Sequence, residues 1–146
     1  MTQEVVYELL RVQNEMHSLA KRGRFVAQAN LHLTLQFLGE VSEQEMGPVV
    51  QALQKTAQDH SAFLLALKCV GSFGNKSPFR VIWGGIDGDT LSLTSLQKDL
   101  SILLSTLGFP QEKRSYQPHI TLGRDVEFLG EVSFEKYSQV WYRYLF

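Results

Sequence analysis

The first twenty residues alternate apolar and polar positions with the period of a helix. The apolar residues, spaced by three and four, are Val5, Leu9, Val12, Met16 and Leu19. This spacing predicts an amphipathic helix over residues 4–22. The "KRG" stretch (21–23) would end it, because basic side chains suit the negative end of the helix dipole and glycine suits a helix stop. That interpretation explains "KRGR" (21–24) more simply than contact with RNA does.

Two further stretches have the same period. Ser42 and Glu45 have the spacing of a capping box, which predicts the start of a helix that runs to about Gln58. Its apolar positions are Val49, Val50, Leu53 and Ala57. After "DGDT" (87–90), leucines at 93, 96, 100, 103, 104 and 107 repeat at three and four. They predict a third helix, which Gly108 would end.

Shorter segments have a period of two or form brief apolar runs, which is typical of β-strands. They cover residues 31–38, 62–70, 80–86 and 118–123, and the aromatic tail (131–146) favours a further strand. "GSFGNKSP" (71–78) has the turn-forming residues of a surface loop. Helices and strands in this order indicate an α+β fold with mostly antiparallel pairing, in a single domain over residues 1–146.

One four-residue pattern, His-x-Thr-Leu, occurs in two of these predicted strands. The first motif, "NLHLTLQFLG" (30–39), contains His32 and Thr34, and the second motif, "YQPHITLGR" (116–124), contains His119 and Thr121. Because side chains alternate along a strand, each histidine shares a face with its threonine. The opposite face would enter a core and consists of Leu31, Leu33, Leu35 and Phe37 in the first motif and Ile120 and Leu122 in the second. Two such copies in a chain with four histidines indicate an internal duplication with two facing lobes.

Paired imidazoles on anchored strands match the needs of phosphodiester hydrolysis. Near neutral pH one imidazole takes a proton from water while the other protonates the departing oxygen. Threonine hydroxyls would donate hydrogen bonds to phosphate oxygens, and Arg124 would add a bidentate cation. No acidic cluster accompanies the histidines, so these residues favour a metal-free reaction over a metal site. The simpler alternative is that each histidine only caps a strand edge.

Composition narrows the classes of function slightly. The 14 basic and 15 acidic residues give a net charge of -1, so no global field attracts nucleic acid or an anionic membrane. The single cysteine, Cys69, excludes an internal disulfide and suits a reducing compartment. The longest apolar run, "AFLLAL" (62–67), is too short to span a bilayer, and the N-terminus lacks a signal-peptide pattern. We therefore expect a soluble cytoplasmic protein.

Both motifs and their surroundings resemble the 2H phosphoesterases, named for paired His-x-Thr/Ser motifs. Within that superfamily they look most like the RNA 2′,3′-cyclic phosphodiesterases, also called 2′-5′ RNA ligases. The matching stretches are "NLHLTLQFLGEV" (30–41), "GSFGNKSPFRVIWGGI" (71–86) and "GFPQEKRSYQPHITLGR" (108–124). The resemblance implies a two-lobed, pseudo-symmetric fold with antiparallel sheets, helices on the outside and a central cleft bearing the two His-x-Thr strands.

The resemblance also implies a reaction, the metal-independent opening of an RNA 2′,3′-cyclic phosphate end to a 2′-phosphate without a cofactor. His32 would be the general acid for the leaving 3′ oxygen, and His119 the general base for water. The residues that would hold the phosphate are Thr34, Thr121 and Arg124. Tyr116 would contact the base or ribose, and further candidates outside the phosphate pocket are Arg80 and Arg114.

The chain departs from the family pattern at both ends. Family members usually have a short strand before the first helix, whereas this chain starts almost at the helix, and its C-terminus looks shorter than usual. Missing edge strands would expose backbone donors and acceptors, which predicts a strand-exchanged homodimer or a weakened lobe. Two other functions stay open: a reversible 2′-5′ RNA ligase that uses the same histidines, and a non-catalytic module that binds RNA ends or nucleotides.

Overall fold

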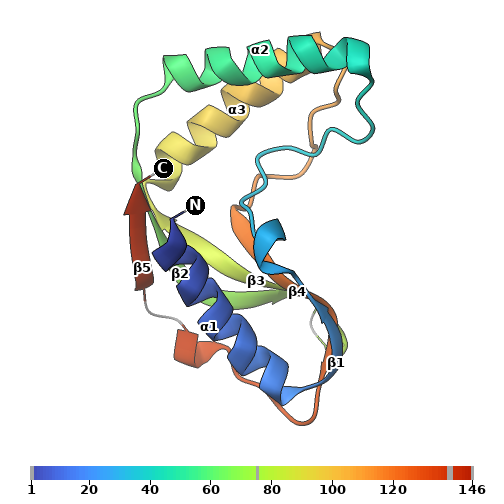
Figure 1. The fold of residues 1–146 in the computed structure, drawn as a ribbon, viewed down its shortest axis with the longest axis vertical. Helices are drawn as coiled ribbons and strands as arrows, with labels where there is room; N and C mark the ends of the chain where they lie inside the picture. The colour runs from blue at the N-terminus through green and yellow to red at the C-terminus, as the bar shows by residue number, and fades with distance from the viewer. Residues whose placement is uncertain (1, 75, 138–139, 146) are drawn as a thin grey trace.

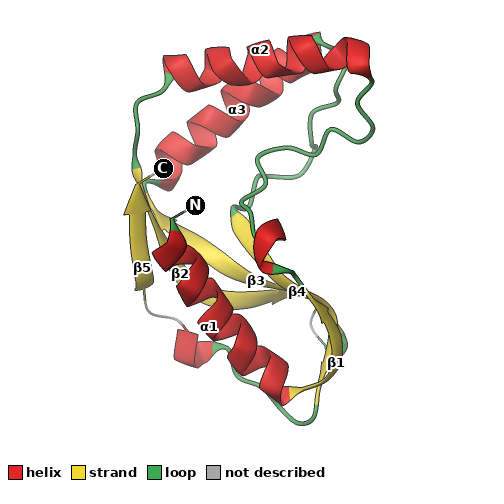
Figure 2. Cartoon of the chain, in the orientation of Figure 1, coloured by secondary structure: helices red, strands yellow, loops and turns green. Residues whose placement is uncertain are grey.

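The computed structural model describes residues 2–74, 76–137 and 140–145 (Figure 1). The helices are α1 (Gln3–Leu19), α2 (Glu43–Asp59) and α3 (Thr90–Thr106). The strands are β1 (Ala20–Phe25), β2 (Leu64–Phe73), β3 (Phe79–Gly88), β4 (His119–Phe128) and β5 (Val140–Leu145), and short 3₁₀ turns cover Gln28–Asn30 and Glu135–Tyr137. Figure 2 shows these elements by type. The predicted α+β class is confirmed.

A five-stranded sheet in the order β1-β4-β3-β2-β5, antiparallel throughout, forms the body of the molecule. Helix α1 covers one face of it (Figure 1). The predicted helical stripe is buried there: Val5, Leu9, Val12 and Met16 are each 0% exposed. They pack against strand residues that include Leu67, Ile82, Ile120 and Leu122. Burial of this one apolar stripe is what fixes α1 on the sheet.

The first helix ends earlier than predicted. It stops at Leu19, and the "KRG" stretch lies in β1, an edge strand, instead of closing the helix. Tertiary contacts explain the difference: the side chains of Lys21 and Arg22 both bind the Glu127 carboxylate on β4, at 2.9 and 2.6 Å. Pairing with β4 therefore outweighs the local preference for a longer helix.

Helices α2 and α3 pack against each other beyond the end of the sheet (Figure 1). The predicted capping box is present, with the Ser42 backbone N–H and hydroxyl both donating to Glu45. The apolar stripe of α2 is narrower than predicted, because only α3 and the adjoining loops cover this helix. Val50 and Leu53 are exposed, as is Ala57, and the buried positions are Val49, Ala52 and Thr56. No helix in the described ranges is long and apolar enough to cross a bilayer.

The first motif does not form the full strand predicted for residues 31–38. It makes one ladder bridge and otherwise runs between the sheet and the α2–α3 pair. Leu31 and Leu33 pack on the core of the sheet, Leu38 packs on the α2–α3 cluster, and Leu35 contacts both. Phe37 is 77% exposed and does not enter the core as predicted. Because this segment crosses from the sheet to the α2–α3 pair, only those side chains that contact one of the two cores are buried.

Two other expectations differ from the structure. The described residues form one sheet, so the arrangement of a sheet in each lobe is not found among them. The predicted loop over residues 71–78 is shorter, because Gly71, Ser72 and Phe73 continue β2 and pair with Trp83, Ile82 and Val81 of β3.

Candidate active site

One antiparallel bridge joins the two histidine motifs. Leu33 of the first motif pairs with Ile120 of β4. Ile120 is 0% exposed, and Leu33 packs against the same core. Residues opposite each other in an antiparallel pair share a face, and their neighbours along each strand point to the other face. The histidines and threonines beside the bridge therefore point away from the core that α1 covers.

The register of this bridge brings four of the predicted residues together. The residue before Leu33 is opposite the residue after Ile120, so His32 faces Thr121, and in the same way Thr34 faces His119. The two imidazoles therefore occupy diagonal corners of a four-residue patch. Residues at such positions lie about 7–8 Å apart, with their Cβ atoms somewhat closer. This separation leaves room for one tetrahedral anion between the rings.

Both imidazoles are held in the same way. His32 Nδ1 lies 2.7 Å from the carbonyl oxygen of Asn30, and His119 Nδ1 lies 2.7 Å from that of Gln117, in each case two residues earlier. A carbonyl only accepts, so each Nδ1 carries a proton and donates it. Each Nε2 is then the atom that accepts a proton when the ring is neutral and donates one when the ring is charged.

Glycines and aromatic rings surround His119 on the sheet. His119 is opposite Gly85, and Thr121 is opposite Trp83. The His119 ring meets the edge or face of Phe73 and Trp83, with ring centroids 5.1 and 6.3 Å away. These contacts restrict the orientation of the imidazole, and Nδ1 is already bonded, so Nε2 is the nitrogen available to a ligand.

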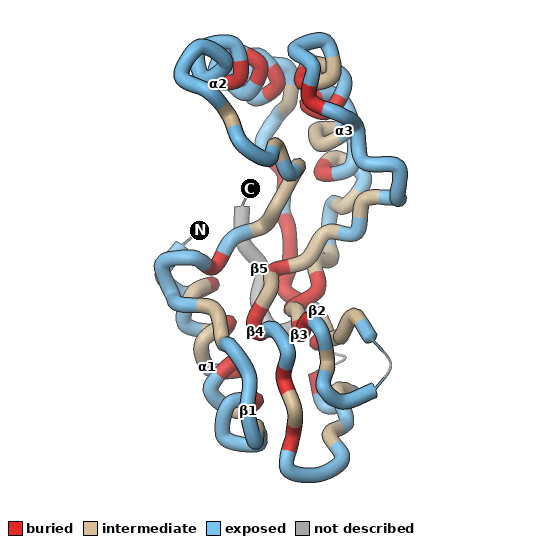
Figure 3. The backbone as a smooth tube through the Cα atoms, turned by 90° about the vertical axis from the view of Figure 1, so that its right-hand side faces the viewer, coloured by how far each residue is buried: buried red, intermediate tan, exposed pale blue. Residues whose placement is uncertain are grey.

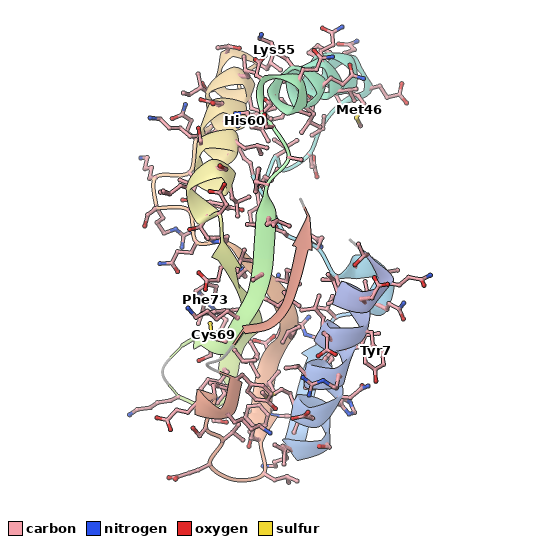
Figure 4. All side chains as sticks on the ribbon, turned by 90° about the vertical axis from the view of Figure 1, so that its left-hand side faces the viewer. Tyr7, Met46, Lys55, His60, Cys69 and Phe73 are labelled. Atoms are coloured by element: carbon pink, nitrogen blue, oxygen red, sulfur yellow. The ribbon has the colours of Figure 1, made fainter. Side chains whose placement is uncertain are left out.

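Small residues make space for this arrangement. A Cβ at Gly71 would lie 2.3 Å from the Trp83 ring, and one at Gly85 would lie 2.6 Å from the sulfur of Cys69. Figure 4 shows Cys69 and Phe73 on the side of the sheet away from α1. Burial raises the pKa of the Cys69 thiol, so this sulfur stays protonated near neutral pH and is a poor nucleophile.

A β-bulge returns Arg124 to the face that carries His119 and Thr121. Strict alternation from His119 would place Arg124 on the opposite face, since five residues separate them. Thr121 pairs with Trp83 and Arg124 pairs with Val81, and the register shifts by one residue between Trp83 and Ile82. Val81 and Trp83 are two apart on β3 and share a face, so Thr121 and Arg124 share it too. Arg124 is exposed there.

The buried side chain of Gln13 on α1 supports this bulge. Its Nε2 donates to the carbonyl oxygens of Val26 and Leu122, each at 2.8 Å. Leu122 is the extra residue at the bulge, and Val26 leads into the first motif, so Gln13 ties both motifs to α1. Gln13 was not among the predicted site residues, although a polar residue beside Val12 in the apolar stripe is a sequence signal of such a role.

Tyr116 joins the two motifs directly. Its hydroxyl donates to the backbone carbonyl of Thr34 at 3.0 Å, and its ring is half-buried against the core of the sheet. The predicted contact with a base or ribose remains a prediction, and the observed bond gives Tyr116 a positioning role. Arg80 is exposed on β3, and Arg114 is exposed and pairs with Glu112 at 3.3 Å.

The two motif histidines differ in exposure. His32 is exposed, and His119 is half-buried. A recess of about 300 Å³ lies beyond the other end of β4, lined by Leu19, residues 129–133 and Lys136, and does not include the motifs. Within the described ranges, no group of three or more His, Cys, Asp or Glu side chains is placed to hold a metal ion.

Comparison with known proteins identifies the family of this chain. Residues 1–83 match the family of LigT-like phosphoesterases. The RNA 2′,3′-cyclic phosphodiesterase of Geobacillus stearothermophilus is 30% identical over 135 residues, 92% of this chain and 42% of the relative. That of Thermotoga maritima is 38% identical over 112 residues, 75% of this chain and 59% of the relative. The chain belongs to the LigT-like phosphoesterase family.

Solved structures have the same fold as this chain. Escherichia coli LigT complexed with 3′-AMP superposes with a TM-score of 0.70 and 31% identity, over 91% of this chain and 73% of that one. The protein TT0787 of Thermus thermophilus superposes with a TM-score of 0.75 and 25% identity, over 100% of this chain and 76% of that one. The chain spans about 40 to 60% of the length of the two curated relatives described above.

Proposed function

We propose that this chain is a metal-independent phosphodiesterase that opens 2′,3′-cyclic phosphate ends of RNA to 2′-phosphates. The observation that carries the proposal is that His32 and His119 have equivalent hydrogen bonds and equivalent neighbours. Both donate from Nδ1 to a carbonyl two residues earlier, and the Leu33–Ile120 bridge puts each beside a threonine of the other motif. Relatives named RNA 2′,3′-cyclic phosphodiesterase supply the class of substrate.

The proposed reaction uses one imidazole on each side of the phosphorus. His119 Nε2 takes a proton from water while the water oxygen forms a bond to phosphorus. The bond from phosphorus to the 3′ oxygen breaks, and protonated His32 gives its Nε2 proton to that oxygen. The product is a 2′-phosphate with a free 3′ hydroxyl, and the two histidines exchange protons with solvent before the next turnover.

The phosphate would be held by groups that point to the same face. Thr34 and Thr121 occupy the corners between the imidazoles and would donate to the non-bridging oxygens. Arg124 would neutralise negative charge that develops on these oxygens. His32 and His119 occupy equivalent positions in the patch, and so do Thr34 and Thr121. This approximate symmetry also supports the proposal that the motifs arose by duplication and belong to two pseudo-symmetric lobes.

The test uses a 2′,3′-cyclic nucleotide and EDTA. Turnover in excess EDTA is expected, with kcat reduced at least a hundredfold by His32→Ala and by His119→Ala. His60→Ala is the matched control, because His60 bonds to Asp99 at 3.0 Å and lies between α2 and β2, away from the patch. Binding of the nucleotide without turnover would instead favour a non-catalytic module. Joining of a 2′,3′-cyclic phosphate end to a 5′ hydroxyl would identify a ligase that uses the same two histidines in reverse.

Assembly and location are separate proposals. We propose a homodimer that pairs through the exposed edges of the sheet, formed by β1 and β5. The lone Cys69 thiol is consistent with action in a reducing cytoplasm. Light scattering at high protein concentration tests the dimer, and a monomeric mass with a cooperative thermal transition would rule it out.

A further inference from the structure

Two arginines stand directly opposite each other on the face that bears the motifs. Arg24 of edge strand β1 pairs with Arg124 of β4, and the next pair along is Phe25 with Gly123. Phe25 packs on the core beneath α1, so Arg24 points to the other face, where Arg124, Thr121 and His119 lie. The inner residues of β1 are exposed, and this strand appears mostly in pale blue in Figure 3.

This pair carries more positive charge than the protein neutralises. Like charges directly opposite each other on a sheet are unfavourable. Asp125, next in the chain after Arg124, forms an ion pair with Arg24. In the part of the chain that the structure describes, Arg124 has no ion pair or hydrogen bond from its side chain. The Arg24 side chain remains 77% exposed. An added anion would relieve the repulsion, and the net charge of the chain, -1, means that such local cations must supply any attraction for phosphate.

The pair also lies in line with the four-residue patch. Along β4 the order is His119, Thr121, Arg124, and a strand rises about 3.3 Å per residue. Arg124 is therefore roughly 7–10 Å past Thr121, with the bulge shortening the path. Arg24 lies level with Arg124 on β1, roughly 5 Å further across the sheet. The long side chain of Arg124 can therefore extend back to the patch, whereas Arg24 lies about one nucleotide of extended RNA away from it.

We propose that Arg24 binds the phosphodiester on the 5′ side of the terminal nucleotide, while Arg124 serves the cyclic phosphate. The inference rests on the proposed function and narrows its substrate to an RNA strand of two or more nucleotides. Binding exchanges the Arg24–Asp125 ion pair for an Arg24–phosphate ion pair. Arg24 is therefore a residue that selects for RNA length.

The experiment compares an RNA pentanucleotide that ends in a 2′,3′-cyclic phosphate with a 2′,3′-cyclic mononucleotide. For Arg24→Ala, the ratio of the two kcat/KM values, pentanucleotide over mononucleotide, is expected to fall by about threefold to tenfold. The plot of log kcat/KM for the pentanucleotide against log salt concentration should become shallower by about 0.7, the amount for one phosphate contact on a single strand. Asp125→Asn should raise the ratio, because it frees Arg24, and asparagine tolerates the positive φ of 52° at this position.

The control is Lys55→Ala on α2, which removes the same charge far from the site (Figure 4) and should leave the ratio and the salt slope as in the unmodified protein. An unchanged ratio in Arg24→Ala overturns the proposal, as does an equal loss on both substrates, which would mark a structural role. If the unmodified protein hydrolyses neither substrate, the proposed function fails instead. The affinity of the pentanucleotide 2′-phosphate for Arg24→Ala and Asp125→Asn, from fluorescence anisotropy, then decides the role of Arg24. Should Arg24→Ala not fold, the direction of the Asp125→Asn effect decides it.

Discussion

Replacing Gln13 by leucine tests whether the bulge at Leu122 depends on α1. The change keeps the approximate size of a side chain that is 6% exposed and removes two hydrogen bonds, each worth about 0.5–1.5 kcal/mol. The Leu122 carbonyl keeps the backbone N–H of Val26 as a donor at 3.0 Å. The Val26 carbonyl, in contrast, loses the Gln13 amide as its donor. An unpaired buried carbonyl adds about 1–3 kcal/mol. The expected loss in the free energy of unfolding is therefore about 2–6 kcal/mol.

Urea denaturation followed by circular dichroism measures this loss. The midpoint should fall while the slope m stays constant, because the surface exposed on unfolding is the same. Gln51→Leu on the exposed side of α2 is the control and should stay within about 0.5 kcal/mol of the unmodified protein. A loss below about 0.5 kcal/mol in Gln13→Leu would refute the reasoning, since it would mean that the two carbonyls are satisfied without Gln13.

Packing and protonation give three further predictions. Gly71→Ala should destabilise the protein by about 1–3 kcal/mol in thermal or urea unfolding, because its Cβ would displace the ring of Trp83; Gly47→Ala on α2, where the added Cβ meets open space, should be neutral or stabilising. The hydroxyl of Tyr137 lowers the pKa of Glu15 below its ordinary value of 4.5. The resulting stabilisation is complete above pH 4.5 and is lost as the pH falls through the lowered pKa, so the stability gap between the protein and Glu15→Gln should close in acid; a gap that does not change with pH would contradict this. The rate of hydrolysis should depend on pH as a bell, and each histidine-to-alanine variant should lose it; a profile with a single limb in the unmodified protein would argue against an acid–base pair.

Local signals predicted most of the helices. The capping box at Ser42 and the stripe of α1 are encoded within one or two turns and appear as predicted. Predictions failed where contacts between residues distant in sequence determine the end of an element or the burial of a side chain. Lys21 and Arg22 leave the helix to pair with Glu127, which is far away in sequence. The alternation of the segment places Phe37 on the same face as Leu31, Leu33 and Leu35. The segment, however, crosses between two cores, and Phe37 is exposed.

The candidate site was predicted in part. The repeated pattern alone pointed to the histidines and threonines, and the bridge at Leu33 brings their segments together. The face on which Arg124 lies follows from the bulge, and a register shift leaves no residue signature that strict alternation would detect. Gly71 matters because it lies against the ring of Trp83, and Trp83 because it contacts the ring of His119. Sequence spacing reveals neither contact.

The two histidines are anchored with unequal strength. His119 begins a ten-residue strand that is hydrogen-bonded on both sides by β1 and β3, whereas the segment of His32 has one bridge and is otherwise held by leucine contacts. Segments with few backbone bonds open at lower free energy than a central strand. Amides around His32 should therefore exchange with deuterium well before those of β4. In the proposed reaction, His119 would keep its position while the segment of His32 moves. That movement would let substrate enter and product leave.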